Sequence, residues 1–238
     1  MNISAKTDVG KQKSTNEDAI TTTQFESAHL LLVADGMGGH AAGDVASDMA
    51  TSIISESVGV ALAADREDYE SILEEAITTA NQDILDYAAE EDIHTMGTTI
   101  VAAIITGEKI VIGNVGDSRA YNVGASLEQV TVDHSLVQEL IDQGEITPEE
   151  AKSHPQRNVI SQSLGTESSV SPDFYDPDID EYLLMCSDGL TEEVEEETIR
   201  ETIDSEDSLE AAVDSLISIA NENGGSDNIS AIVARPHK

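Results

Sequence analysis

Several residue types are scarce in this chain of 238 residues, and each scarcity excludes a class of protein. The single cysteine, Cys186, excludes an internal disulfide, and its place in the apolar stretch YLLMCSDG favours a buried thiol over a reactive one. The longest apolar runs, near 30–34 and 100–105, are far shorter than the roughly 18 residues that a membrane-spanning helix needs. The first residues, MNISAKTDVG, lack the pattern of a secretory signal. We therefore expect a cytoplasmic protein that does not enter a membrane.

Basic residues are also scarce, because 11 lysines and arginines face 48 aspartates and glutamates, for a formal net charge of −37. Such a surface repels phosphate polyanions, which argues against nucleic acid or anionic lipid as a partner. It also repels itself unless salt screens it, and the screening length falls from about 8 Å at ordinary ionic strength to about 3 Å near 1 M salt. We expect a host with a salty cytoplasm; the alternative is an ordinary acidic protein kept soluble by its charge.

The chain has enough apolar residues, 39%, to bury a core, and we expect one domain over residues 1–238. Apolar positions at helical spacing predict neighbouring antiparallel helices near 42–53 and 69–87, and another near 209–220 that ends at Gly224. Between these helices the pattern predicts strands, at 30–34, 98–106, 109–115, 118–123, 170–175, 182–186 and 229–234. Runs of strands set apart from helices predict an α+β layered fold rather than an alternating parallel sheet.

Two connections carry recognisable turn and cap signals. Gly107 and Glu108 join two of the predicted strands as a glycine-first loop of two residues, which suits a type II′ turn. The segment 135–165 looks like an insertion with a short helix near 136–141. A second helix in the insertion would begin at TPEE, 147–150, where a threonine cap, a first-turn proline and a glutamate form a capping box.

Two Asp-Gly pairs, at Asp35–Gly36 and at Asp188, each follow a strand-like apolar run. A hairpin turn would need a second strand at once, whereas the residues after both pairs look helical. Carboxylates at strand ends suit hard cations such as Mg²⁺ and Mn²⁺, and a glycine lets a backbone carbonyl approach equally closely. Asp227, at the entry to the last strand, and Asp117, between two strands, extend this set. The sequence therefore predicts a metal site.

A rival interpretation of VADGMGGHAAG is a phosphate-binding loop, because Gly36, Gly38 and Ala41 match the pattern G-x-G-x-x-G/A. A dinucleotide-binding fold needs a second parallel strand with an acidic residue about 20 residues further on, whereas a second helical pattern follows here. Asp35 would also face the pyrophosphate. The metal-site interpretation is therefore favoured.

The motifs, taken in order, resemble those of the metal-dependent protein serine/threonine phosphatases, the protein phosphatase 2C-like family, in its compact prokaryotic form. The likeness covers nearly the whole chain, through TDVGKQKSTNEDA, VADGMGGHAAGDVAS, MGTTIVAAI, NVGDSRAY, TVDHSLVQELIDQGEITPEEAKSHPQRNVISQSLG, YLLMCSDGL and GGSDNISAIVA. It implies an α-β-β-α sandwich, in which two antiparallel sheets are flanked by helix pairs and a two-metal centre lies at one edge.

The resemblance also implies the metal ligands. Asp35 would bridge two Mg²⁺ or Mn²⁺ ions, Gly36 would add its carbonyl to one of them, and Glu17 would reach the same ion largely through water. Asp188 and Asp227 would hold the other ion. Each of these carboxylates has the alternative role of a capping or salt-bridging group.

The chemistry implied by the resemblance is hydrolysis by a metal-activated water, which attacks phosphorus in line with the departing serine or threonine oxygen. Asp117 would help to bind a weaker third ion. His40 is the candidate general acid, because its ordinary pKa near 6.5 suits that task. In eukaryotic relatives the acid directly follows the Asp-Gly pair, where this chain has Met37, so a structural role of His40 at a helix start is the alternative.

The main departure from the family lies at the phosphate clamp. The family usually carries an arginine four residues before the glutamate of the first motif, and this chain has Lys13 there. An ammonium cannot grip two phosphate oxygens with a planar fork, so we expect weaker substrate binding with the metal site retained. The alternative is that Lys13 is a solvated surface residue. In the insertion, which resembles the substrate-facing flap of the family, Gln162 replaces an arginine of many bacterial members.

The sequence thus predicts a Mg²⁺- or Mn²⁺-dependent phosphatase that releases phosphate from phosphoserine and phosphothreonine in proteins. We expect a monomer whose substrates come from a Hanks-type kinase. One alternative is a phosphatase-fold protein that binds or senses partners without turnover, against which the intact set Asp35, Asp188 and Asp227 argues. Another is an acidic metal buffer, which would not need carboxylates at strand ends.

Overall fold

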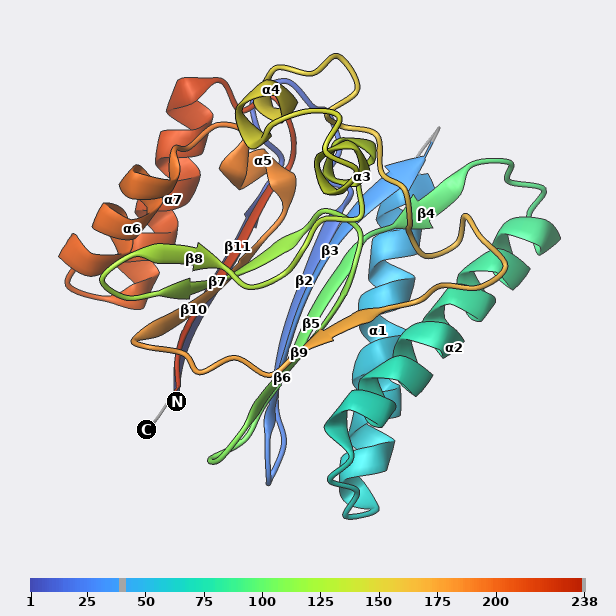
Figure 1. Ribbon diagram of the computed structural model, residues 1–238. Helices are drawn as coiled ribbons and strands as arrows, with labels where there is room; N and C mark the ends of the chain where they lie inside the picture. The colour runs from blue at the N-terminus through green and yellow to red at the C-terminus, as the bar shows by residue number, and fades with distance from the viewer. Residues whose placement is uncertain (39–41, 237–238) are drawn as a thin grey trace.

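Two antiparallel sheets stacked face to face form the centre of the computed structural model, which describes residues 1–38 and 42–236 (Figure 1). The first sheet has the order β1-β11-β10-β7-β8, with bounds β1 (Asn2–Asp8), β7 (Arg119–Val123), β8 (Leu127–Gln129), β10 (Tyr182–Cys186) and β11 (Ile229–Arg235). The second has the order β2-β3-β5-β6-β9, with β4 paired to β3, and its bounds are β2 (Asp18–Gln24), β3 (His29–Gly38), β4 (Met96–Thr98), β5 (Ile100–Ile105), β6 (Ile110–Val115) and β9 (Asp173–Tyr175).

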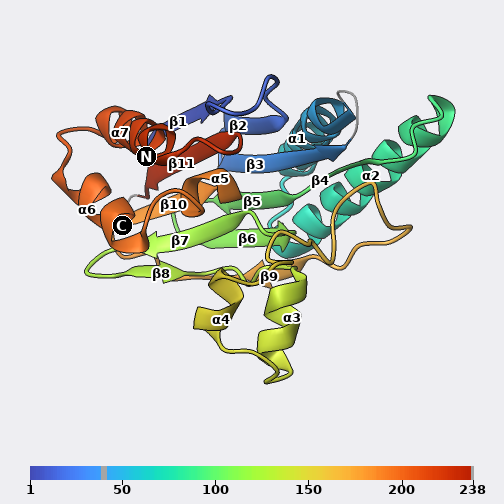
Figure 2. The ribbon, with the colours of Figure 1, turned by 90° about the horizontal axis from the view of Figure 1, so that it is seen from above.

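Helices cover the outer face of each sheet, so the fold has the layers α-β-β-α (Figures 1 and 2). The second sheet is covered by α1 (Ala42–Ala63) and α2 (Tyr69–Glu90), and the first by α6 (Glu196–Ser205) and α7 (Leu209–Asn223). The short helix α5 (Asp188–Thr191) follows β10, and α3 (Leu136–Asp142) and α4 (Pro148–Lys152) project from the sandwich (Figure 2). The predicted α+β class and its four layers are confirmed.

The apolar run of β3 has no polar face because both faces of this strand are buried. Leu30 and Leu32 pack in the cluster beneath α1 and α2, whereas Leu31 and Val33 pack between the sheets against residues such as Ile232. Side chains alternate along a strand, so a strand inside two layers must be apolar at every position. This run therefore fixes the strand that carries Asp35 in the middle of the molecule.

The structure corrects the expected end of this strand. β3 does not end at Asp35; it continues through Gly36 to Gly38, and its last residues pair with β4. The helix that follows begins at Ala42, where it was expected. Asp35 is therefore held by strand pairing on both of its sides rather than at a free strand exit, which limits its backbone motion.

The connection between β5 and β6 is also corrected. The two strands form the predicted hairpin, but Gly107 is not among the residues with positive φ, which the first position of a type II′ turn requires. The Thr106 hydroxyl instead accepts hydrogen bonds from the backbone N–H groups of Glu108 and Lys109, at 3.2 and 2.9 Å. A side-chain turn of this kind needs no left-handed residue.

Other predicted elements agree with the structure, and some elements were not predicted. The capping box at Thr147 and Glu150 is present, and Gly224 ends α7. β9 is shorter than expected, and β1, β2, β4 and β8 had no prediction. The residues after Asp188, which were expected to be helical, form α5 and begin α6. Within the described ranges, no helix combines the length and the apolarity that a transmembrane span requires.

Candidate metal centre

Acidic side chains from both sheets meet at one edge of the sandwich, the upper edge in Figure 1. Asp35 lies in β3, directly across from Asp18, the first residue of the paired strand β2. Asp188 begins α5 just after β10, and Asp227 lies just before β11, the antiparallel neighbour of β10. Because antiparallel neighbours run in opposite directions, the end of β10 and the beginning of β11 share an edge.

The charges of this cluster act on Asp35 most strongly. Burial raises the pKa of Asp35 well above its usual value, and the charges of Asp18 and Asp188 raise it further. Asp117 and Asp227 act in the same direction. Four of the predicted carboxylates, together with Asp18, are thus close enough to repel one another.

Two carboxylate oxygens in this cluster are buried without a hydrogen-bond partner among the described residues, Oδ1 of Asp18 and Oδ1 of Asp188. The pKa of Asp188 is raised to about 8, first by burial and then by the charges of Asp117 and Glu192. A buried, unpaired carboxylate oxygen is costly unless a cation or a hydrogen-bond donor satisfies it. Divalent cations such as Mg²⁺ and Mn²⁺ prefer carboxylate oxygens of this kind, so the chemistry of these donors suits a metal site.

Gly36 supplies a second sign of a close-packed oxygen cradle. A Cβ atom at Gly36 would lie 2.1 Å from the carbonyl oxygen of Gly43 and 2.4 Å from that of Glu17, so no larger residue fits. The Gly36 N–H donates to this Glu17 oxygen at 3.0 Å. The backbone at Gly36 is therefore held close to the segment that carries Glu17.

Lys13 lies at the same site and forms an ion pair with Asp227, one of the predicted metal ligands. Its Nζ atom is 2.5 Å from Oδ1 of Asp227. Partial burial lowers the pKa of Lys13, but Asp227, and then Asp35 and Glu17, raise it, and the net direction is upward. As the side chains stand, no three His, Cys, Asp or Glu residues of the described chain form a group that could hold an ion. Metal binding at these carboxylates would therefore require their side chains to rearrange.

Glu17 lies on the Lys13 side of the cluster, where several backbone contacts fix it. Its N–H donates to Oδ1 of Asn228 at 2.9 Å, and its carbonyl oxygen accepts from the Ser47 hydroxyl at 2.6 Å. Burial raises the pKa of Glu17, the charge of Lys13 lowers it, and that of Asp44 raises it, with a net upward direction. The Glu17 carboxyl therefore belongs to the edge of the same electrostatic group.

Asp117 stands between β6 and β7 and is also buried. Its pKa is raised to about 6, first by burial and then by the charge of Asp133. The nearby Arg119 is engaged by Asp133, with its Nε and Nη2 atoms donating to the carboxylate at 2.9 and 2.6 Å. Arg119 is therefore not free to bind a substrate phosphate. His40, the candidate acid, lies outside the described residues.

Asp18 is a component of the site that the sequence did not indicate. Its Oδ2 atom accepts hydrogen bonds from the hydroxyls of Ser187 and Ser230, at 2.7 and 2.6 Å, so one carboxylate joins the two sheets. Burial raises its pKa to about 6, although the two hydroxyls lower it. No pattern in the sequence marked Asp18, because the register of β2 with β3 decides its position.

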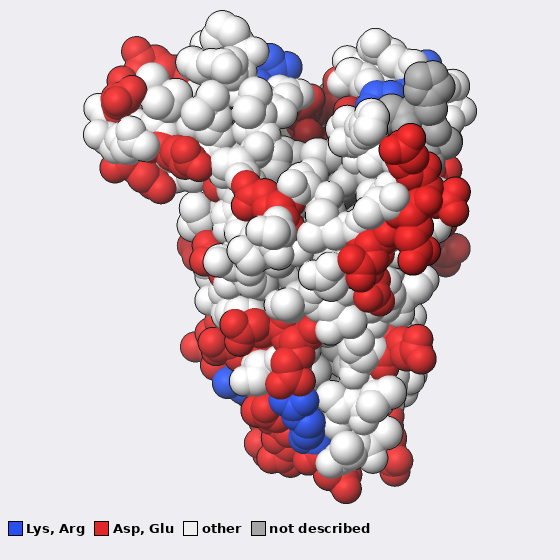
Figure 3. Space-filling model, turned by 90° about the vertical axis from the view of Figure 1, so that its right-hand side faces the viewer, with Lys and Arg blue, Asp and Glu red and all other residues white. Residues whose placement is uncertain are grey.

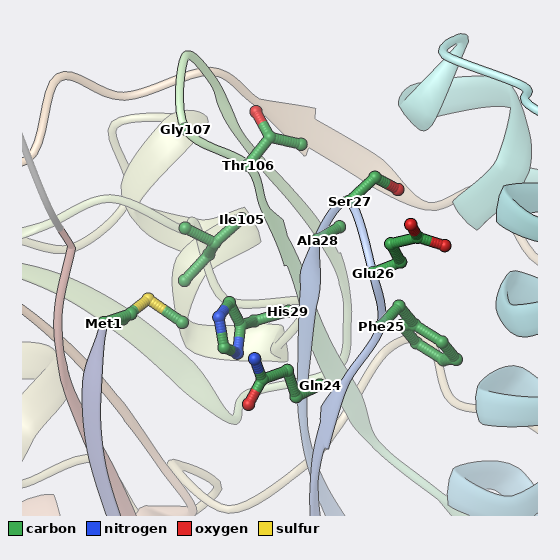
Figure 4. Close-up of a pocket in the computed structure, with 10 residues that line it drawn as sticks. All are labelled: Met1, Gln24, Phe25, Glu26, Ser27, Ala28, His29, Ile105, Thr106 and Gly107. Carbon is green, nitrogen blue, oxygen red and sulfur yellow. The ribbon is translucent and has the colours of Figure 1, made fainter.

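A separate hollow lies at the other end of the sandwich, between the β2–β3 and β5–β6 turns (Figure 4). Its volume is about 200 Å³, and Phe25, His29 and Ile105 are among the residues that line it. His29 and Asp35 are six positions apart on β3, which corresponds to roughly 20 Å along a strand. The hollow is therefore not part of the carboxylate site.

An α-β-β-α sandwich with clustered, partly unpaired carboxylates at one edge defines a class of metal-dependent hydrolases, and comparisons with known proteins identify the family within it. A model described as Protein phosphatase 2C matches residues 10–234. The serine/threonine phosphatase stp of Listeria monocytogenes is 41% identical, over 98% of this chain and 95% of its own length. The chain therefore belongs to the protein phosphatase 2C family.

Solved structures agree with this assignment. The serine/threonine phosphatase of S. agalactiae has a TM-score of 0.90 and 37% identity, over 98% of this chain and 99% of its own. The catalytic domain of the serine threonine protein phosphatase PstP in complex with two manganese ions has a TM-score of 0.82 and 34% identity, over 98% and 97%. The predicted resemblance, the sandwich fold and the enzyme class, protein-serine/threonine phosphatase, are confirmed.

Proposed function

We propose that this protein hydrolyses phosphoserine and phosphothreonine in other proteins and uses Mg²⁺ or Mn²⁺ as its cofactor. Residues 1–238 would form one domain, in which residues 135–165 are the flap. The observation that carries this proposal is the cluster around Asp35, in which buried carboxylate oxygens of Asp18 and Asp188 have no partner in a chain of this family. A related phosphatase domain binds two manganese ions, which supports the choice of metal.

The roles of the residues follow from the chemistry of their donors. Two ions would supply an activated water and would neutralise charge on the phosphoryl oxygens. The residues that would hold these ions, and a third ion in the case of Asp117, are Asp35, Gly36, Asp188, Asp227, Glu17 and Asp117. Lys13 would bind the phosphate group of the substrate, and His40 would protonate the departing oxygen.

Turnover of p-nitrophenyl phosphate and of a phosphothreonine peptide tests the proposal directly. We expect activity with Mn²⁺ and none after chelation with EDTA. A protein that binds the peptide with metal but releases no phosphate would instead support the alternative function, a binding or sensing protein without turnover. The contact of Lys13 with Asp227 is the observation that favours this alternative, because it engages a predicted metal ligand.

Replacing Lys13 by the arginine usual in the family is expected to strengthen substrate binding. Lys13→Arg should lower KM for a phosphopeptide by about tenfold, because a guanidinium binds two phosphate oxygens as a fork. The matched control is Lys11→Arg, two residues away on an exposed position of the same loop. Equal KM values for both variants would show that Lys13 is a surface residue and not a phosphate ligand.

The acidic surface leads to a prediction about salt. Acidic side chains spread over the face that α2 presents, with few basic ones between them (Figure 3). For a net charge of −37 we expect the Tm to rise by more than about 10 °C between 0.1 and 2 M KCl, as screening removes the repulsion. Sucrose at equal osmolality is the control. A Tm that does not change with KCl concentration would indicate an ordinary acidic protein rather than a protein from a halophilic host.

The proposed partners are phosphorylated proteins and a Hanks-type kinase that produces them. Co-expression with such a kinase, followed by phosphoproteomics with and without the phosphatase, would test this pairing. The monomeric state and the cytoplasmic location stay predictions from the sequence.

A further inference from the structure

The loop that carries Lys13 has no secondary structure of its own. Residues 9–17, here called the clamp loop, connect β1 of one sheet with β2 of the other. The N–H groups of Lys11 and Gln12 donate to the carbonyl oxygen of Gly225, at 2.8 and 3.1 Å. These two bonds hold only the first part of the loop, so other contacts must fix the part from Lys13 to Glu17.

One side chain joins both ends of the clamp loop. The Nδ2 atom of Asn228 donates to the carbonyl oxygens of Val9 and Thr15, at 2.9 and 3.0 Å. Its Oδ1 atom accepts from the N–H of Glu17 at 2.9 Å. The Asn228 side chain is buried, and its three bonds use both the donor and the acceptor end of the amide.

The chemistry of these contacts requires an amide at this position. A carboxylate would turn an oxygen toward the carbonyl oxygens of Val9 and Thr15, and an apolar side chain would leave all three backbone groups unpaired. The backbone N–H of Asn228 also donates to Oδ1 of Asp227 at 2.8 Å, the oxygen that contacts Lys13. Asn228 thus connects the clamp loop to the residue that Lys13 faces.

We infer that Asn228 is a positioning residue, whose amide holds the clamp loop in the one shape that places Lys13 for contact with the substrate phosphate. The inference rests on the proposed function, in which Lys13 is the phosphate ligand. A lysine needs this support more than an arginine does, because its flexible stem ends in a point charge and gains no orientation from a planar fork. Fixing the loop therefore removes part of the entropy that binding would otherwise cost.

A double-mutant cycle separates positioning from a merely structural role. Asn228→Ala and Lys13→Ala are each expected to raise KM for a phosphopeptide by about tenfold with a smaller change in kcat. The KM of the double variant should not exceed the higher of the two single-variant KM values. If Asn228 only supported the fold, the two effects would multiply to about a hundredfold. Multiplication would overturn the inference.

A matched control is available on the other side of the molecule. Asn122 also uses both ends of its amide on a loop, because it donates to the Asp180 carboxylate at 3.2 Å and accepts from the Asp180 N–H at 2.9 Å. Asn122→Ala should therefore lower stability without changing KM and without coupling to Lys13. If Asn228→Ala does not fold, Asn228→Asp keeps the side-chain shape and replaces it in the cycle.

Amide hydrogen exchange on the metal-free protein gives a readout that does not depend on turnover. The Glu17 amide donates to Asn228, so its exchange should become at least about tenfold faster in Asn228→Ala, whereas amides in the middle of β3 should not change. Unchanged exchange at Glu17 would overturn this inference. Absence of metal-dependent turnover in the unmodified protein would instead overturn the proposed function, so the two failures are distinguishable.

Discussion

Asp35→Asn is expected to reduce kcat for a phosphopeptide by about a thousandfold or more, because Asp35 would hold metal ions in the proposed function and a neutral amide lacks the charge that binds them. The same change should stabilise the metal-free protein. Asp35 carries a raised pKa because burial and four neighbouring carboxylates oppose its charge, and an amide of the same shape removes that opposition. We therefore expect Asp35→Asn to lose activity and, in EDTA, to have a higher Tm than the unmodified protein.

The measurements need a control that changes the same chemical group elsewhere. Asp83→Asn alters an exposed aspartate on α2, far along the chain from the site, and should leave kcat and Tm unchanged. Manganese binding by calorimetry should be weakened only in Asp35→Asn. If Asp35→Asn kept a tenth or more of the activity, or bound manganese as the unmodified protein does, Asp35 would not be a metal ligand.

The residues of the site that were predictable from the sequence are those whose neighbours along the chain carry the signal. Asp35 and Asp188 follow apolar runs and precede glycine, and Asp227 precedes the last strand. The prediction grouped these positions as strand ends that meet at a common edge. Asp188 and Asp227 do lie at strand ends, whereas Asp35 lies within β3, before the part that pairs with β4. The structure places these three carboxylates together, and their role as ligands stays a proposal.

The residues that were missed depend on pairing between distant segments. β2 has the sequence DAITTTQ, whose threonines give no clear apolar period, so neither the strand nor its register with β3 was predictable. Only that register places Asp18 opposite Asp35. Ser187 and Ser230 reach Asp18 because two antiparallel strands end beside it, and nothing in their own sequence separates them from other serines. The amide of Asn228 was missed for the same reason.

The carboxylate cluster should give the metal-free protein an unusual dependence of stability on pH. The pKa of Asp188 is raised to about 8, and those of Asp18 and Asp117 to about 6. A raised pKa means that the native state binds more protons than the unfolded state, so the stabilising contribution is complete below about pH 4 and is lost as the pH rises through 6 and then 8. In EDTA, the Tm should fall by roughly 5–10 °C between pH 5 and pH 8.5.

Surface carboxylates cannot produce this slope, because groups with ordinary pKa values near 4 are already ionised at pH 5. Asp188→Asn should therefore flatten the upper part of the profile, above pH 7, whereas Asp83→Asn should leave the whole profile unchanged. Saturating Mn²⁺ should raise the Tm most at high pH, since ionised carboxylates bind the cation and protonated ones do not. Equal slopes with and without Mn²⁺ would mean that these carboxylates do not take up the metal, and the site would have to be sought elsewhere in the fold.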